Sequence, residues 1–343
     1  MKGLAPGEVL LDRFRVVETL GRGAMGVAYR VDDLQTGEAR VVKVMAKSAR
    51  DNPRGVQRFE REASLGKSLD HPGIVAALES GELPDGGRYL VMDYAPGEDL
   101  GEWLEAHPDL PNEQRLALCV QLLSAAASAH AVGVVHRDLK PDNIRVSNNA
   151  DGPCLRILDF GISKNVALVA SHTEAGLGTP MWTAPEQGAD GYVPTKRDDV
   201  WALGLLAFYI LSGKIYWRSV ARRQSAAGVA LELIRSEIEP ASSRAIELEG
   251  NTLGAGFDSW FARCVNRDPA QRFADAGSAL EALMDNEVEP RTESTTASES
   301  APVAVDQDRP RKVGLPSPLV VALLVGSAGL MAYAIFWLIS RTR

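Results

Sequence analysis

The order of apolar and polar residues predicts strands in the first part of the chain. Residues 13–21 and 26–33 read as two strands on either side of a glycine turn, and residues 38–45 read as a third. Pro53 suits the first turn of a helix that Asn52 can cap. Apolar or small residues then recur on one face of this helix, at Val56, Phe59, Ala63 and Gly66. A small sheet with one helix is therefore expected first.

Beyond residue 93 the pattern is typical of helices. Residues 112–131 form one long candidate, and the stretch "VWALGLLAFYIL" at 200–211 is apolar on all sides and ends at Gly213, a suitable C-cap. A helix that is apolar all round belongs in the interior of a large lobe. The globular part is therefore expected to be α+β, with a small sheet followed by a larger helical lobe.

The last 59 residues differ in composition from the rest. Residues 285–318 contain a long stretch without aromatic residues, leucine or isoleucine, which predicts a disordered linker. Residues 319–339 carry no charge over about the 20 positions that cross a hydrocarbon core of roughly 30 Å. Tyr333 and Trp337 lie toward one end, as interfacial aromatic residues do. We therefore expect one transmembrane helix at 319–339 and a short tail at 340–343.

Charge and cysteine content exclude several classes of protein. The chain has 37 Lys and Arg against 45 Asp and Glu, a net charge of -8, which argues against a nucleic-acid partner. Its three scattered cysteines favour free thiols over zinc sites or disulfides. The N-terminus has an apolar run of only three residues at 9–11, too short for a signal-peptide core. The globular part is therefore expected in the cytoplasm, where ATP is available.

The glycine turn is the first candidate site. Gly21, Gly23 and Gly26 fit the pattern GxGxxG, which alone is weak because glycine-rich hairpins also occur for steric reasons. Here the glycines join two strands and do not open a helix. That setting speaks against a dinucleotide fold and favours a loop that covers the phosphates of ATP.

A stronger signal follows in "HRDLKPDN" at 136–143 and "LDFG" at 158–161. With "VVK", "GTPMWTAPE", "DVWALG" and "RDPAQRF" in the same order and spacing, the chain resembles the protein kinase superfamily from about residue 14 to 283. The lysine at position 140 of this loop resembles the serine/threonine class of the family. The resemblance implies a bilobal kinase domain at 14–284, with the N-lobe and hinge at 14–95 and the C-lobe at 96–284.

The resemblance implies a role for each residue of the catalytic loop. Asp138 would accept the proton of the substrate hydroxyl, and Lys140 would neutralise the terminal phosphate. Asn143 and Asp159 would supply oxygen ligands to Mg²⁺, with Mn²⁺ as a possible substitute.

Other positions of the resemblance concern the N-lobe and the C-lobe core. Lys43 would bind the inner phosphates of ATP if Glu62 pairs with it, although Glu62 alone also reads as a solvated helix charge. The pair Asp198 and Asp199 reads as a helix start, and the family pattern makes Asp199 the buried residue that braces the catalytic loop. Two further residues resemble the buried structural ion pair of the family, Glu186 and Arg272.

The adenine pocket departs from the family. Kinases commonly have valine where this chain has Ala28 and alanine where it has Val41, so the two sizes are exchanged. Because swaps that conserve volume are tolerated, we expect a pocket of ordinary capacity with a shifted roof. The rest of the nucleotide site would comprise Leu20, Met92 behind the pocket, the backbone of Asp93 and Ala95, and Asp99 near the ribose.

Regulation is expected in the activation segment. Arg137 precedes Asp138, the arrangement in which a phosphorylated loop residue pairs with the arginine. Thr173 is the expected main autophosphorylation site and Ser171 the second, with a solvated loop threonine as the alternative. The basic stretch at 218–224 either faces acidic partners or is a solvated face.

Taken with the tail, these features resemble bacterial Hanks-type serine/threonine kinases with a C-terminal transmembrane anchor. The expected protein uses ATP, phosphorylates proteins, sits in the inner or plasma membrane with its kinase domain in the cytoplasm, and forms a homodimer for trans-autophosphorylation. A pseudokinase scaffold that binds nucleotide and recruits partners is the alternative. The presence of Lys43, Asp138, Asn143 and Asp159 favours the enzyme. Phosphorylation of a small molecule is disfavoured by "GTPMWTAPE".

Overall fold

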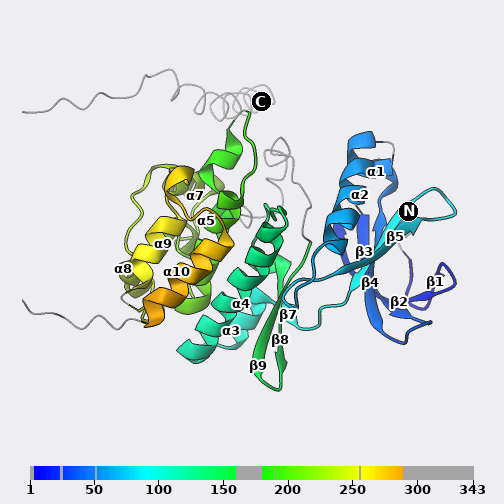
Figure 1. Cartoon of the computed structure of the whole chain (residues 1–343), viewed down its shortest axis with the longest axis horizontal. Coiled ribbons are helices and arrows are strands. Elements are labelled where there is room, and N and C mark those ends of the chain that lie inside the picture. Colours follow the sequence, from blue (N-terminus) through cyan, green and yellow to red (C-terminus); the bar gives the residue numbers. More distant parts are fainter. Residues whose placement is uncertain are drawn as a thin grey trace, which may run out of the picture. The chain divides into compact units, whose positions relative to one another are not determined.

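The computed structural model describes residues 4–23, 26–50, 52–159, 180–189, 191–254 and 256–288. Its N-terminal part is built on a six-stranded antiparallel sheet in the order β1-β2-β3-β4-β6-β5 (Figure 1). The strands are β1 (Val9–Leu10), β2 (Phe14–Gly23), β3 (Gly26–Asp33), β4 (Ala39–Met45), β5 (Ala77–Glu82) and β6 (Arg88–Asp93). The three strands expected from the sequence are confirmed as β2, β3 and β4.

Two helices accompany this sheet, α1 (Lys47–Arg50) and α2 (Pro53–Lys67). The expected apolar face of α2 is confirmed, because Phe59 and Ala63 are buried in one cluster with the strand residues Met45 and Leu90. Gly66 lies so close to β5 that a Cβ there would approach the Ala77 Cβ to 2.5 Å. The helix therefore packs directly on the sheet through small and apolar residues.

The C-terminal part is mainly helical. Its helices are α3 (Leu100–Ala106), α4 (Asn112–Ala131), α5 (Lys196–Ser212), α6 (Arg218–Ala221), α7 (Ala226–Arg235), α8 (Ala241–Glu247), α9 (Phe257–Cys264) and α10 (Ala276–Val288). Short 3-10 turns are η1 (Pro141–Asn143), η3 (Pro180–Trp182), η4 (Pro185–Gly188) and η5 (Pro269–Gln271). A small sheet of β7 (Glu98–Asp99), β8 (Ile144–Asn149) and β9 (Gly152–Ile157) completes this part.

Helix α5 is the centre of the helical part, and it packs against α4, α9 and α10. Nearly every residue along it is buried, as its all-apolar sequence predicts. The helix ends at Gly213, whose left-handed φ of 73° suits glycine and whose N–H donates to the Tyr209 carbonyl. The expected interior helix and its C-cap are confirmed.

The two parts are joined by more than the hinge after β6. The segment between α2 and β5 pairs with β9, where the Ile157 N–H donates to the Gly73 carbonyl at 2.8 Å and the Val75 N–H donates to the Ile157 carbonyl at 3.0 Å. The Asp93 N–H donates to the Ala76 carbonyl at 3.0 Å. The fold is therefore bilobal, with a sheet-rich N-lobe and a helical C-lobe whose contact includes backbone pairing.

The C-terminal boundary differs from the expectation. Helix α10 continues to Val288, past the expected start of the linker at residue 285, because Leu283 anchors its last turns in the core. Among the residues that the structure describes, none of the helices is long and apolar enough to cross a membrane. The expected transmembrane helix at 319–339 and most of the expected linker lie outside those residues.

Candidate active site

The loop between α4 and β8, residues 132–143, carries the expected catalytic residues, and a buried carboxylate from α5 holds it. Asp199 is 1% exposed. Its Oδ2 accepts the His136 N–H at 2.7 Å, and its Oδ1 accepts the Arg137 N–H at 2.8 Å. Arg137 has a left-handed φ of 69°, a conformation that costs free energy for a residue other than glycine. The two hydrogen bonds from backbone N–H groups to Asp199 offset that cost. The geometry thus confirms the predicted bracing role.

Two histidines extend this network, and their partners fix their tautomers. His130 Nδ1 accepts the Ala276 N–H at 3.0 Å, so its Nε2–H donates to Asp199 Oδ2 at 3.0 Å. His136 Nδ1 accepts the Asp138 N–H at 3.2 Å, so its Nε2–H donates to the Leu158 carbonyl at 2.8 Å. His136 thereby ties the loop to Leu158, the residue between β9 and Asp159.

Burial and hydrogen bonding act in opposite directions on Asp199. Burial favours the neutral acid, but the hydrogen bond from His130 and the backbone N–H of Arg137 outweigh it. The pKa of Asp199 therefore lies below its ordinary value, and the carboxylate is ionised at neutral pH.

Asp138 lies at the centre of the loop with two of the expected residues around it. Asn143 Nδ2 donates to the Asp138 backbone carbonyl at 2.7 Å and to its Oδ2 at 3.1 Å. Lys140 Nζ lies 4.0 Å from the same Oδ2. The structure therefore brings the Asp138 carboxylate, the Asn143 amide and the Lys140 ammonium group together within six residues of the chain.

The expected metal ligands meet at one end of the β8–β9 hairpin. Ile144 pairs with Ile157, and the Leu158 N–H donates to the Asn143 carbonyl at 2.9 Å. Asp159 follows directly, with a left-handed φ of 55° and a side chain that is 38% exposed. Because Asn143 uses its Nδ2 on Asp138, its Oδ1 is the atom that can coordinate a cation. An amide oxygen beside a carboxylate is a donor set that Mg²⁺ prefers, so these residues fit the metal.

Lys43 reaches this end of the hairpin from the N-lobe sheet. Its Nζ lies 3.7 Å from Asp159 Oδ1, and its side chain is only 12% exposed. On β4 it pairs in register with Ala28 on one side and Leu90 on the other. The lysine and the expected metal ligand, 116 positions apart in the sequence, are thus neighbours.

The glycine turn and the expected pocket roof lie on the same sheet. Gly26 approaches Val44 so closely that a Cβ would lie 2.2 Å from its carbonyl oxygen, so no larger residue fits. By contrast, a Cβ at Gly21 or Gly23 would meet no atom within 4 Å, which leaves open space above the turn for a phosphate. Ala28 and Val41 are diagonal neighbours on the face that carries Lys43, where the predicted exchange of sizes requires them to be.

The expected hinge residues lie at the end of β6 and beyond it. Met92 pairs with Val41, which is two residues from Lys43 on β4, so Met92 lies on the same face of the sheet as Lys43. Ala95 is buried, and Leu20 is 46% exposed on β2 beside the glycine turn. Asp99 is the N-cap of α3, where its Oδ1 accepts the Glu102 N–H at 2.9 Å. The carboxylate expected near the ribose therefore also has a structural task.

Several expectations concern residues outside the described set. The backbone of Glu62 is helical, but its side chain is not described, so its pairing with Lys43 stays a prediction. Ser171, Thr173 and Thr179 lie in the interval 160–179, which is not described. Within the described ranges, no group of three or more His, Cys, Asp or Glu residues forms an additional metal site.

The expected structural ion pair is confirmed. Arg272 is buried and binds both carboxylate oxygens of Glu186, at 2.6 Å and 2.9 Å. The same guanidinium donates to the carbonyls of Arg197 and Asn266 and lies 4.9 Å from the Trp201 ring centroid. This pair joins η4 to the residue after η5, and the Arg197 contact adds the start of α5.

Sequence reasoning missed the burial of Asp198, which was expected only as part of a helix start. Asp198 is 2% exposed, and its Oδ2 accepts the Tyr192 hydroxyl and, at 2.7 Å, the Thr195 N–H. Burial raises the pKa of Asp198 to about 6 despite these hydrogen bonds. The signal was the sequence Thr195-x-x-Asp198, a capping box with aspartate in the place of glutamate.

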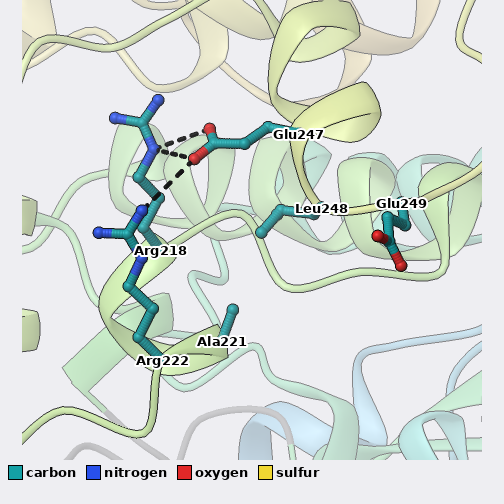
Figure 2. A pocket seen from close by; sticks show the side chains of 6 residues that line it. All are labelled: Arg218, Ala221, Arg222, Glu247, Leu248 and Glu249. Atoms are coloured by element: carbon teal, nitrogen blue, oxygen red, sulfur yellow. Dashed lines mark hydrogen bonds and ion pairs between the residues drawn. The ribbon is translucent and has the colours of Figure 1, made fainter.

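The basic stretch at 218–224 borders a cavity of about 370 Å³ that lies apart from the residues above. Figure 2 shows Arg218 and Arg222 directed toward Glu247, with Leu248 beside them. Arg218 Nε binds both carboxylate oxygens of Glu247, at 2.6 Å and 2.7 Å, whereas Arg222 is 65% exposed and 3.9 Å from it. Much of the local positive charge is thus neutralised within the fold.

Comparison with known proteins agrees with this geometry. Residues 14–285 match the protein kinase domain family. The chain is 32% identical to serine/threonine-protein kinase pkn3 of Myxococcus xanthus, over 79% of this chain and 49% of that protein. It is 34% identical to pkn2 of the same organism, over 82% of this chain and 33% of that protein. The chain thus spans about half or less of the length of these relatives.

A third relative and a solved structure extend the likeness. The chain is 32% identical to serine/threonine-protein kinase PrkC of Bacillus subtilis, over 67% of this chain and 34% of that protein. The crystal structure of the PknI kinase domain of Mycobacterium tuberculosis is 25% identical, with a TM-score of 0.60 over 83% of this chain and 99% of that one.

Proposed function

The chain belongs to the protein kinase family, and we propose that it is a serine/threonine protein kinase of the bacterial Hanks type. It transfers the γ-phosphoryl group of ATP to serine and threonine hydroxyls of proteins. One observation supports this proposal above the others. The Asp199 network holds Asp138 and Asn143 beside Asp159, and Lys43 reaches the same point from the other lobe.

Each polar residue has a chemical task in this proposal. Asp138 accepts the proton of the attacking hydroxyl, whose oxygen forms the new bond to phosphorus as the bond to the ADP oxygen breaks. Lys140, 4.0 Å from Asp138, neutralises charge on the transferred group. Lys43 binds the inner phosphates, and the backbone of Asp93 and Ala95 binds the adenine edge under Ala28 and Val41.

Asn143 and Asp159 would hold Mg²⁺, or Mn²⁺ in its place. When bound, the metal neutralises charge on the phosphates of ATP. The hydrogen bond from Asn143 Nδ2 to Asp138 turns the amide so that its oxygen serves the metal. The same bond keeps the Asp138 carboxylate oriented for the proton.

A radiometric assay with Mg-ATP and a protein substrate tests the proposal. Lys43→Met and Asp138→Asn should each lower kcat at least a hundredfold, because they remove phosphate neutralisation and the proton acceptor. Lys67→Met and Asp151→Asn are matched controls in an exposed helix end and an exposed turn, and they should leave kcat unchanged. Equal rates for wild type, Lys43→Met and Asp138→Asn would refute the enzyme and favour the pseudokinase scaffold.

We propose further that autophosphorylation of Thr173, and secondarily of Ser171, activates the enzyme in a homodimer. Arg137, held in place by Asp199, would pair with the new phosphate. Phosphopeptide mapping after incubation with ATP tests this. Active enzyme in which Thr173 carries no phosphate would contradict it.

We also propose that residues 319–339 anchor the kinase in the inner or plasma membrane, with the kinase domain in the cytoplasm. The support is their uncharged composition over the length of a membrane span. Removal of residues 289–343 leaves α10 intact and should release the protein from membranes without changing its kcat on a soluble peptide. A truncated protein that still sediments with membranes would refute the anchor.

A further inference from the structure

The side chain of Asp93, at the end of β6, is bound by arginines from both lobes. Arg40 Nη1 of β4 donates to Asp93 Oδ1 at 2.8 Å, and Arg156 Nη2 of β9 lies 3.7 Å from Asp93 Oδ2. The two guanidinium groups use different carboxylate oxygens, so both contacts exist at once. All three side chains are partly sheltered, with exposures of 18% for Arg40, 24% for Asp93 and 27% for Arg156.

Arg156 has a second contact that makes it more than a simple ion-pair partner. Its Nε donates to the Pro72 carbonyl at 3.2 Å. The neighbouring Gly73 carbonyl accepts the N–H of Ile157, the residue after Arg156. One arginine thus joins the hinge, the segment between α2 and β5, and strand β9.

These contacts link the two ends of the proposed nucleotide site. Asp93 is a hinge residue whose own N–H is already used on the Ala76 carbonyl. Arg156 lies three residues before Asp159, on the strand whose end is tied to the catalytic loop through Leu158. A shift of the hinge relative to β9 would therefore change the distance between the adenine edge and the metal ligand. The next hinge residue is also held, because Arg30 of β3 stacks on Tyr94 at 4.9 Å.

We propose that Arg156 and Arg40 are positioning residues for nucleotide binding, and that with Asp93 they form an electrostatic clamp between the hinge and both lobes. The proposal rests on the proposed kinase function. The clamp holds the hinge backbone at a fixed separation from Asp159, so ATP binds an arrangement that is already formed. None of the three side chains takes part in the chemical step.

The clamp predicts a split between binding and catalysis. Arg156→Gln should raise the KM for ATP and the Kd for Mg-ATP about fivefold, as expected for the loss of one partly sheltered ion pair. The kcat at saturating ATP should stay within about twofold of wild type, because Lys43 and Asp138 are untouched. The effect should shrink in high salt, because ion pairs near the surface are screened.

A double-mutant cycle separates this role from general packing. Asp93→Asn should weaken ATP binding at least as much as Arg156→Gln does, and the double variant should be no weaker than the stronger single variant, because Asp93→Asn already removes the ion pair that Arg156→Gln removes. Arg156→Lys keeps the charge and should recover at least half of the loss. Arg88→Gln is the matched control: this arginine lies at the other end of β6, paired with Glu60 and Glu82 at 3.2 Å, and should leave the Kd unchanged.

Three results would overturn the clamp while leaving the kinase proposal intact, provided wild type binds and turns over ATP. They are an unchanged KM in Arg156→Gln, additive effects in the double variant, and an equal effect of Arg88→Gln. Failure of the wild-type protein itself to bind Mg-ATP would instead overturn the proposed function, and the clamp with it.

Discussion

Replacement of Asp199 by asparagine tests how the catalytic loop is held. The two residues have the same shape, but asparagine has one acceptor oxygen where aspartate has two. If that oxygen keeps the bonds from His130 and His136, the new NH₂ group faces the Arg137 N–H, which donates to Oδ1 at 2.8 Å in the native protein. One charge-assisted hydrogen bond is lost, at about 1.5–3 kcal/mol, and the partly buried Arg137 N–H loses its Asp199 acceptor, at about 1–3 kcal/mol. Asp199→Asn should therefore cost about 3–5 kcal/mol of stability.

The same change should affect catalysis at temperatures where the protein is still folded. Arg137 keeps its left-handed φ of 69° through its bond to Asp199, and Asp138 is the next residue. Without that bond the loop relaxes, and kcat should fall more than tenfold. Urea denaturation followed by tryptophan fluorescence gives the stability, since Trp201 and Trp217 are buried in the helical core. Steady-state kinetics below the transition give kcat.

Asp198 supplies the control from the adjacent position. Its two hydrogen bonds, from the Tyr192 hydroxyl and the Thr195 N–H, both end on Oδ2, so one asparagine oxygen can keep both. Asp198→Asn should therefore leave kcat within about twofold of wild type. If Asp199→Asn has the stability and kcat of wild type, or if Asp198→Asn lowers kcat as strongly, Asp199 does not brace the catalytic loop.

Three further outcomes follow from the same contacts. Because burial raises the pKa of Asp198 to about 6 from an ordinary value of 3.8, wild type should lose about 2 kcal/mol relative to Asp198→Asn as pH rises from 4 to 6, measured by urea denaturation. Arg272→Lys cannot bind both oxygens of Glu186 and should cost about 3 kcal/mol in the same assay. Ala28→Val should weaken Mg-ATP binding several-fold by crowding Val41, and the double variant Ala28→Val/Val41→Ala should restore it.

The sequence predicted best those features that depend on local pattern. The strands around the glycine turn, the apolar face of α2 and the interior helix ending at Gly213 each follow from periodicity and capping residues nearby in the chain. The pairing of Glu186 with Arg272, 86 residues apart, could be expected only from the resemblance to a family. No local pattern contains that information, because the contact exists only after the lobe has folded.

The features that sequence reasoning missed are polar contacts made by tertiary packing. Arg156 reads as an ordinary charged residue of a strand, yet β9 lies next to the segment at 73–75 and so carries its side chain to Asp93. Helix α5 is enclosed on all sides, so its sequence has no single apolar face that would separate buried from exposed positions. The burial of Asp198 therefore could not be predicted from periodicity. The only local sign of this carboxylate is the capping box that Asp198 forms with Thr195.

The contacts divide the site into two parts that should respond differently to substitution. The catalytic loop is held by buried partners in the C-lobe core, where each lost hydrogen bond leaves an unpaired group and is costly. The hinge is held by partly exposed arginines, whose loss water can compensate. Changes around Asp199 should therefore lower kcat and stability together, whereas changes around Asp93 should alter nucleotide affinity with little loss of stability. Adjustment of ATP affinity is thus separable from preservation of the catalytic geometry.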